Sequence, residues 1–300
     1  MAQWSGVSYP SNSMDEDATV RGWVRAWSKE ALSYIGDDCA VLPGSKRGFD
    51  ALLKTDAVVC GRHFNQEDAP SKVGYKALGR VLSDFAAMGG QLQSVMVSIG
   101  IPKEIEPSYI RRLYRGMGRL ADKYSVQLVG GETTRCSDLW VNVCGIGKVK
   151  KGRAVLRSTA GAGDRLFVTG RLGGSFPKRH LRFVPRVKEG RWLAEKRMAS
   201  AMMDLSDGLG KDLPRMALAS GLSYEVEPTL LPRYRGINAS QAVNDGEDYE
   251  LLLAVPEVKV EKLRAVWPFT TRLTEIGQMV LKTKMNKTHG LEMQGFDHFL

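Results

Sequence analysis

Carboxylates occur in this chain at positions where the neighbouring residues are apolar, and such residues can hold metal ions or protons. Asp84 is the clearest case, because a helical spacing of about 100° per residue places it on the same face as Val73 and Val81. A carboxylate on such a face must be paired, protonated or bound to a metal, since burying it alone costs on the order of several kcal/mol. Two interpretations follow: an ion pair with Arg80, one helical turn earlier, or a metal site.

Further acidic residues lie at the ends of expected strands and in turns. Asp56 interrupts the apolar run LLKTDAVV, where aspartate is a poor strand former, and the segment MDLSDGL contains Asp204 and Asp207. The same pattern holds for Asp37, Asp38, Glu132, Glu247 and Asp248. Each can be read singly as a cap or turn residue. Together they favour divalent cations held between carboxylates and a polyphosphate, because Mg²⁺ prefers oxygen ligands and bridges these two groups.

The sequence lacks the common nucleotide-binding motifs. It contains no GxxxxGK[ST] loop, no kinase HRD and DFG pair and no dinucleotide-binding GxGxxG. The four cysteines and four histidines show neither zinc-ligand nor disulfide spacing, so we expect reduced, buried thiols. Ser206 has no histidine near it in the sequence, which gives a serine hydrolase little support. Phosphate chemistry at an acidic, metal-holding site is the interpretation that remains.

The elements that would position these carboxylates alternate between strands and helices. In the first half we expect strands over 50–59, 93–102, 127–131 and 139–149 and helices over 71–90 and 107–125. The second half should contain strands over 166–170 and 247–255, a helix over 205–221 and an irregular basic segment over 176–197. This alternation predicts an α/β (α+β mixed) fold with two layers per domain. The polar, turn-rich segment KKGRAVLRSTAGAGDR predicts a boundary near residue 150, between domains of 1–150 and 151–300.

Composition places the chain among soluble globular proteins, with 43% hydrophobic and 25% charged residues. No apolar run approaches the roughly 20 residues of a membrane helix, and the N-terminus lacks a secretory signal, so we expect a cytoplasmic protein. The net charge of +10 favours an anionic partner. Because the basic residues are scattered and form no nucleic-acid-binding motif, we favour a solvated basic surface over nucleic-acid binding.

Nine segments of the chain together resemble the thiamine-monophosphate kinase family, within the superfamily of aminoimidazole ribonucleotide synthetase. They occur in the family's order: GDDCAVL, KTDAVVCGRHF, GYKALGRVLSDFAAMGG, QLVGGETTR, LRSTAGAGDRLFVTGRLG, RHLRFVPRV, MDLSDGL, GEDYELLL and GFDHF. The resemblance implies ATP-dependent transfer of a phosphoryl group to thiamine monophosphate, which gives thiamine diphosphate. It also implies a homodimer, in which domain 1–150 binds ATP and Mg²⁺ and forms a barrel with strands of a second subunit. Domain 151–300 would be an α/β layer that completes the active site.

The resemblance also assigns roles to the residues that match the family motifs. Ligands of several Mg²⁺ ions would be Asp38, Thr55, Asp56, Asp84, Glu132, Asp204 and Asp207. Contacts to ATP would come from Gly131, Glu132, Arg157 and Ser206, and the thiamine monophosphate site from His63, Glu247 and Phe296. Catalysis would rest on Asp84, Asp207 and Arg157. The two aspartates would hold Mg²⁺ ions, and these ions together with Arg157 would neutralise charge for direct in-line transfer. No catalytic base is needed, because a phosphate monoester with a second pKa of about 6 is mostly dianionic at neutral pH.

Three positions in the acidic segments depart from the family pattern. Glu132 stands where the family usually has aspartate, Lys54 replaces a small polar residue, and Val81 replaces a common asparagine. Two alternatives therefore stay open: an ATP-using enzyme of the same superfamily that acts on another phosphorylated metabolite, and a catalytically eroded nucleotide- or RNA-binding homologue. In every case we expect the Ser-Asp-Gly of residues 206–208 to open a helix whose N-terminus favours an anion.

Overall fold

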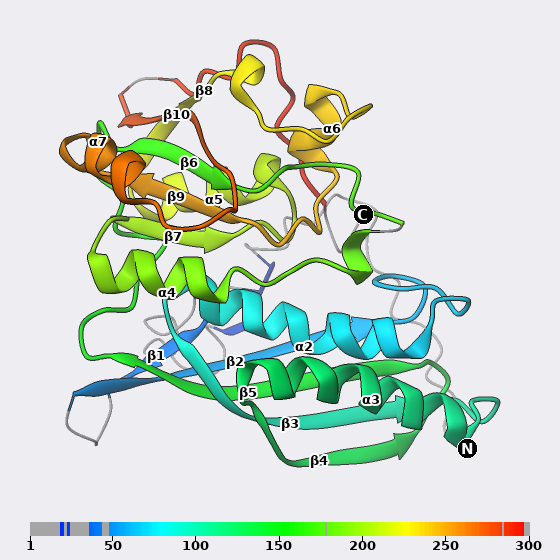
Figure 1. The fold of residues 1–300 in the computed structure, drawn as a ribbon. Helices are drawn as coiled ribbons and strands as arrows, with labels where there is room; N and C mark the ends of the chain where they lie inside the picture. The colour runs from blue at the N-terminus through cyan, green and yellow to red at the C-terminus, as the bar shows by residue number, and fades with distance from the viewer. Residues whose placement is uncertain are drawn as a thin grey trace. The chain divides into compact units, whose positions relative to one another are not determined.

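The computed structural model of the 300-residue chain describes residues 19–20, 23–24, 36–43, 48–177, 179–283 and 285–296. Nearly all of them belong to one compact unit, Asp37–Phe296. Within this unit the chain forms two five-stranded sheets, and Figure 1 shows the helices that accompany each sheet. None of the described helices is long and apolar enough to cross a membrane.

The first sheet has the strand order β1-β2-β5-β3-β4. Its strands are β1 (Ala40–Leu42), β2 (Phe49–Val59), β3 (Gln91–Ile101), β4 (Gln127–Arg135) and β5 (Trp140–Lys150). Neighbouring strands are antiparallel except β3 and β4, which are parallel. Helices α2 (Pro70–Ala87) and α3 (Pro107–Tyr124) pack against each other, and α2 lies on β2 and β5 (Figure 1).

Helix α2 carries Asp84, and its own sequence explains where it begins and ends. Pro70 stands at the start of the helix, where its fixed φ suits the first turn and its missing N–H is not needed. Gly89 adopts a φ of 68° just beyond the last turn, which stops the helix. The apolar face, with Val81 and Phe85, is buried in the core of the first sheet. Asp84 is therefore carried into the interior by the apolar residues around it.

The second sheet has the strand order β7-β9-β6-β10-β8, and all its neighbouring strands are antiparallel. Its strands are β6 (Arg165–Thr169), β7 (Ala201–Asp204), β8 (Leu222–Val226), β9 (Leu251–Val255) and β10 (Leu273–Leu281). The same half contains α4 (Val187–Lys196), α5 (Leu209–Ala219), α6 (Ala239–Asn244), α7 (Glu257–Val266) and the short 3-10 helices η2 (Arg179–Leu181) and η3 (Pro228–Leu230). Because α2 contacts α4 and β7 as well as β2, it connects the two sheets.

The α/β class is confirmed, and so are the strands and helices expected in the first half, with β4 longer than expected. The expected irregular segment 176–197 is wrong in its second part, because Val187–Lys196 forms α4. The helix is short, and its buried apolar side chains Leu193 and Ala194 stand among charged residues, so the sequence resembles a polar segment. The strand expected over 247–255 begins at Leu251, because positive φ angles of 56° at Glu247 and 52° at Tyr249 exclude an extended backbone.

Three further expectations can be compared with the structure. The helix expected over 205–221 begins at Leu209, since residues 201–204 form β7 and the chain turns directly after it. All four cysteines are free, but only Cys39 is fully buried. The chain passes from the first sheet to the second between Lys150 and Arg165, where the domain boundary is expected. Because Asp37–Phe296 form a single compact unit, the division into domains 1–150 and 151–300 stays a prediction.

Candidate active site

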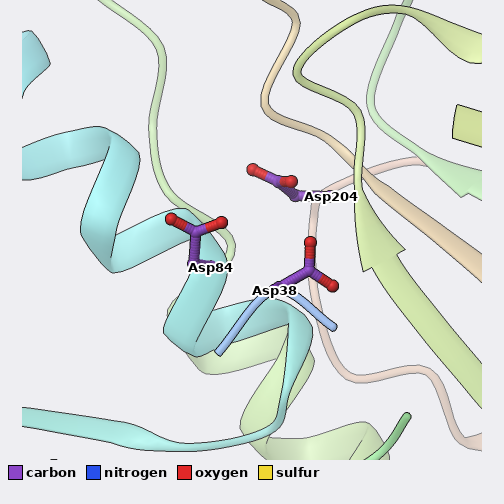
Figure 2. A group of neighbouring side chains, drawn as sticks. All are labelled: Asp38, Asp84 and Asp204. Carbon is purple, nitrogen blue, oxygen red and sulfur yellow. The ribbon is translucent and has the colours of Figure 1, made fainter. Parts of the chain in front are cut away.

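Three aspartates from distant parts of the sequence converge on one another. Asp38 precedes β1, Asp84 lies on α2, and Asp204 is the last residue of β7. One carboxylate oxygen from each lies within 4.8 Å of the corresponding oxygens of the other two, and Figure 2 shows the side chains close together. All three residues are at most 5% exposed. We refer to Asp38, Asp84 and Asp204 as the acidic group.

Burial makes the charges of the acidic group costly. It raises the pKa of Asp204 to about 7, and the neighbouring charge of Asp38 contributes to this shift. Burial also raises the pKa of Asp84, although the charge of Lys54 opposes that shift. Oδ2 of Asp38 and Oδ2 of Asp84 are buried without a hydrogen-bond partner. Buried carboxylate oxygens gathered in this way fit a divalent cation such as Mg²⁺.

Basic residues lie between α2 and β2 beside the acidic group. Lys54 Nζ is 3.0 Å from Asp84 Oδ1, and the guanidinium of Arg80 is 2.8 Å from Asp56 Oδ2. The ion pair considered between Arg80 and Asp84 is therefore wrong. Lys54 and Asp56 are two positions apart in β2, so both side chains point to the face that α2 covers. Arg80 and Asp84 of α2 thus pair with residues of β2 rather than with each other.

The turn after β7 is fixed by an ion-pair network. Ser83 Oγ donates a hydrogen bond to Asp204 Oδ2 over 2.6 Å. Arg215 binds the carboxylate of Asp207, and the backbone N–H of Asp207 donates to Asp212 Oδ2 over 3.0 Å. Arg215 also lies 3.2 Å from Asp212 Oδ1. Asp207 is thus held at the start of α5 and does not belong to the acidic group as the structure places it.

Two of the residues expected at the thiamine monophosphate site are joined by Lys76. Its ammonium group donates to the carbonyl oxygen of His63 over 2.5 Å and to the carboxylate of Glu247. Nδ1 of His180 lies 3.0 Å from Oε2 of Glu247. Burial would raise the pKa of Glu247, but the hydrogen bond with His180 and the charge of Lys76 outweigh it and lower that pKa to about 2. Glu247 is therefore ionised throughout the physiological range.

The turn after β7 also contains or contacts residues that are expected to bind the two substrates. Ser206 lies within this turn and is half-buried. The backbone N–H of Phe296 donates to the carbonyl oxygen of Asp207 over 2.8 Å, and Phe296 is 40% exposed. Arg157 reaches the acidic group directly, because its Nη2 donates to Asp38 Oδ1 over 3.0 Å. The structure thus places Arg157 next to the converging carboxylates.

The remaining expected ligands lie on the first sheet, outside the acidic group. Gly131 and Glu132 belong to β4, whose nine residues are all exposed. Oε1 of Glu132 accepts a hydrogen bond from the next backbone N–H over 2.9 Å. A Cβ at Gly131 would lie 1.9 Å from the carbonyl oxygen of Val97, so the close approach of β4 to β3 requires glycine. Thr55 Oγ1 donates to a side-chain oxygen of β5 over 3.0 Å.

Several residues of the site were not anticipated from the sequence. They are Lys76, His180, Asp212 and Arg215. Lys76 could have been found by the argument used for Asp84, because it follows Val73 by three positions on the apolar face of α2 and is 0% exposed. Asp212 carries the same signal, because it lies between Leu209 and Met216 on the apolar face of α5 and is 0% exposed. His180 and Arg215 carry no comparable signal.

Similarity to known proteins extends over most of the chain. Residues 36–149 match the family described as AIR synthase related protein, N-terminal domain. The chain is 35% identical to a thiamine-monophosphate kinase of Bacillus subtilis (strain 168), over 88% of its length and 93% of that protein. It is 33% identical to a thiamine-monophosphate kinase of Salmonella typhimurium (strain LT2), over 92% of its length and 94% of that protein. In structure it is similar to AaThiL complexed with AMPPCP and TMP, with 28% identity, a TM-score of 0.81 and coverage of 94% of this chain and 96% of that one.

Proposed function

The chain belongs to the thiamine-monophosphate kinase family, and we propose that this kinase transfers the γ-phosphoryl group of ATP to thiamine monophosphate, giving thiamine diphosphate. Relatives named for this activity match it over most of both chains, and the similar structure of AaThiL holds AMPPCP, an ATP analogue, together with TMP. The convergence of Asp38, Asp84 and Asp204 carries the proposal. Two anionic phosphates can react only where positive charge is held between them, and these carboxylates can hold it.

Mg²⁺ is the ion that the acidic group would hold. The unpaired Oδ2 atoms of Asp38 and Asp84 and the charge of the three carboxylates suit a small divalent cation with oxygen ligands. When bound, Mg²⁺ supplies positive charge that offsets and orients the phosphate oxygens. Further ions that arrive with the nucleotide would meet the other expected ligands, Thr55, Asp56, Glu132 and Asp207.

The protein's own residues would bind and orient the two substrates. Arg157, held by Asp38, would direct positive charge toward the transferred phosphoryl group. Glu247 is ionised, and its negative charge suits the cationic thiazolium ring of thiamine, with His63 and the exposed Phe296 completing that site. ATP would contact Gly131, Glu132 and Ser206. The acceptor phosphate is mostly dianionic at neutral pH, so direct in-line transfer needs neither a base nor a phosphorylated protein.

We propose the family's organisation as well: a cytoplasmic homodimer in which domain 1–150 binds ATP and Mg²⁺ and domain 151–300 completes the active site. The edge strand β4 supports the dimer, since its residues are exposed and include the apolar Leu128 and Val129. Pairing of this edge with a second subunit would also cover the strand that carries Gly131 and Glu132.

A turnover assay with the purified chain tests the proposed function. Incubation with ATP, MgCl₂ and thiamine monophosphate should give thiamine diphosphate by chromatography. Asp84→Asn should reduce the rate by at least about 100-fold, because it removes one charge of the acidic group. Glu261→Gln, at an 85% exposed side chain on α7, is the matched control and should leave the rate unchanged. RNA retention that falls steeply with salt, from a folded chain without turnover, would instead favour the eroded binding homologue.

A further inference from the structure

Lys54 stands beside the acidic group and forms a direct ion pair with one of its carboxylates. Its Nζ lies 3.0 Å from Asp84 Oδ1, and the two side chains are only 24% and 8% exposed. The position is one at which the sequence departs from the family pattern, where a small polar residue is usual. A small polar side chain there would bring no positive charge to Asp84.

In each member of the acidic group, one carboxylate oxygen is already bound by the protein. The three contacts are Lys54 to Asp84, Arg157 to Asp38 and Ser83 to Asp204, at 3.0, 3.0 and 2.6 Å. Oδ2 of Asp38 and Oδ2 of Asp84 remain buried without a hydrogen-bond partner. The oxygens open to a metal ion are therefore not those that Lys54 and Arg157 bind.

The charges around the acidic group also limit the number of divalent ions that it can hold. The five carboxylates of this region belong to Asp37, Asp38, Asp56, Asp84 and Asp204, and its three ion-paired cations are Lys54, Arg80 and Arg157. With all five carboxylates ionised, two net negative charges remain, which a single divalent ion neutralises. Two such ions would leave a clear excess of positive charge among buried groups, where uncompensated charge is costly.

We propose that Lys54 is a built-in counter-cation that takes the place of one divalent ion, so that the nucleotide-free protein binds one such ion rather than two. The inference rests on the proposed function, in that it takes the acidic group to be the metal site. Lys54 thereby determines how the protein depends on metal: one ion is held by the chain itself, and any further ion arrives with the nucleotide.

Mn²⁺ titration of the nucleotide-free full chain, with free Mn²⁺ measured by electron paramagnetic resonance, tests this inference. Wild type should bind one Mn²⁺. Lys54→Ser should bind two, or bind the first at least about tenfold more tightly, because a positive charge next to Asp84 is removed. Lys54→Arg retains the charge and should behave as wild type. Lys150→Ser, which removes a 61% exposed lysine of β5, controls for net charge.

The outcomes separate this inference from the proposed function. The role of Lys54 would be overturned if wild type bound two Mn²⁺ ions. It would also be overturned if wild type, Lys54→Ser and a second neutral variant, Lys54→Gln, bound the same number of Mn²⁺ ions with the same affinity. Either result would leave the metal site in place. Mn²⁺ binding by none of the proteins would overturn the metal site itself. A neutral variant that is unfolded by circular dichroism without metal and folds when Mn²⁺ is added supports the inference, since the ion then replaces the lost cation.

Discussion

At the scale of single residues, Glu247 makes the stability of the fold depend on pH. Its folded pKa of about 2 lies below the ordinary 4.5, so its ionised form stabilises the protein above about pH 4.5, and this contribution is lost as the pH falls toward 2. Glu247→Gln should lower the free energy of unfolding at pH 7 by about 3 kcal/mol, because the buried ammonium of Lys76 loses its counter-charge. Urea unfolding at pH 7 and at pH 3 measures the effect, which should shrink at pH 3.

The control for this prediction is again Glu261→Gln, whose side chain is 85% exposed. It should change the free energy of unfolding by less than about 0.5 kcal/mol at either pH. A loss for Glu247→Gln that is the same at pH 3 as at pH 7 would contradict the low pKa of Glu247.

Single residues also show how far sequence reasoning reaches. The spacing of apolar residues predicts that Asp84 is buried, and it is, with 5% exposure. The same spacing cannot predict its partner, because Lys54 comes from β2 and meets Asp84 only through the way α2 lies across that strand. The nearer candidate on the same helix, Arg80, pairs with Asp56 instead. Burial is encoded locally, whereas the choice between several opposite charges depends on tertiary packing.

At the scale of elements, α2 and α3 approach closely through glycine. A Cβ at Gly116 would lie 1.8 Å from the carbonyl oxygen of Ser71, and a backbone atom cannot move aside as a flexible side chain can. Gly116→Ala should therefore push the helices apart and lower the free energy of unfolding by about 1–3 kcal/mol. Gly118→Ala, in the same helix, meets nothing within 4 Å and should raise it by up to about 1 kcal/mol. Chemical denaturation measures the free energy of unfolding of both variants. If the two substitutions changed it by the same amount in the same direction, helix propensity and not packing would determine their effect.

Elements differ in how well their sequences reveal them. Helix α3 combines an initial Pro107 with a regular apolar face, and the sequence predicts it within one residue of its end. Helix α4 is short and buries Leu193 and Ala194 among charged neighbours, so its sequence predicts an irregular segment. The start of β9 is displaced because positive φ values at Glu247 and Tyr249 depend on contacts of the site, not on strand propensity. A boundary fixed by tertiary contacts, as at the start of β9, is thus harder to predict than α2, whose limits its own proline and glycine set.

At the scale of the whole molecule, the acidic group exists only because two sheets meet around α2. Asp38 lies just before β1 of the first sheet, Asp84 lies on α2, and Asp204 ends a strand of the second sheet. No local pattern in the sequence relates these positions. Composition and periodicity could therefore indicate that carboxylates bind a metal, but they could not indicate which carboxylates lie together. The resemblance to the family named Asp38, Asp84 and Asp204 together with four other ligands. The structure brings these three together, and the positions of the other four relative to bound metal stay predictions.

The exposed edge of the first sheet leads to a prediction about assembly. β4 pairs with β3 alone among the described strands, and its apolar residues Leu128 and Val129 are 53% and 61% exposed. Unpaired backbone groups next to exposed apolar side chains are unfavourable in a monomer, whereas pairing with a second chain satisfies both. We therefore expect the wild-type chain to be a dimer by light scattering and Val129→Lys to be a monomer, because a charge would then be buried in the interface.

Val258→Lys is the matched control for the dimer, because Val258 is 90% exposed on α7 and lies outside the first sheet. It should leave the dimer intact. Since Gly131 and Glu132 lie on the same strand as Val129, loss of the dimer should also weaken ATP binding, which fluorescence titration with a labelled ATP analogue would measure. A monomeric wild type, or a Val129→Lys variant that stays dimeric, would show that β4 is not the interface. In that event nucleotide binding, and not dimer formation, would have to account for the exposure of β4.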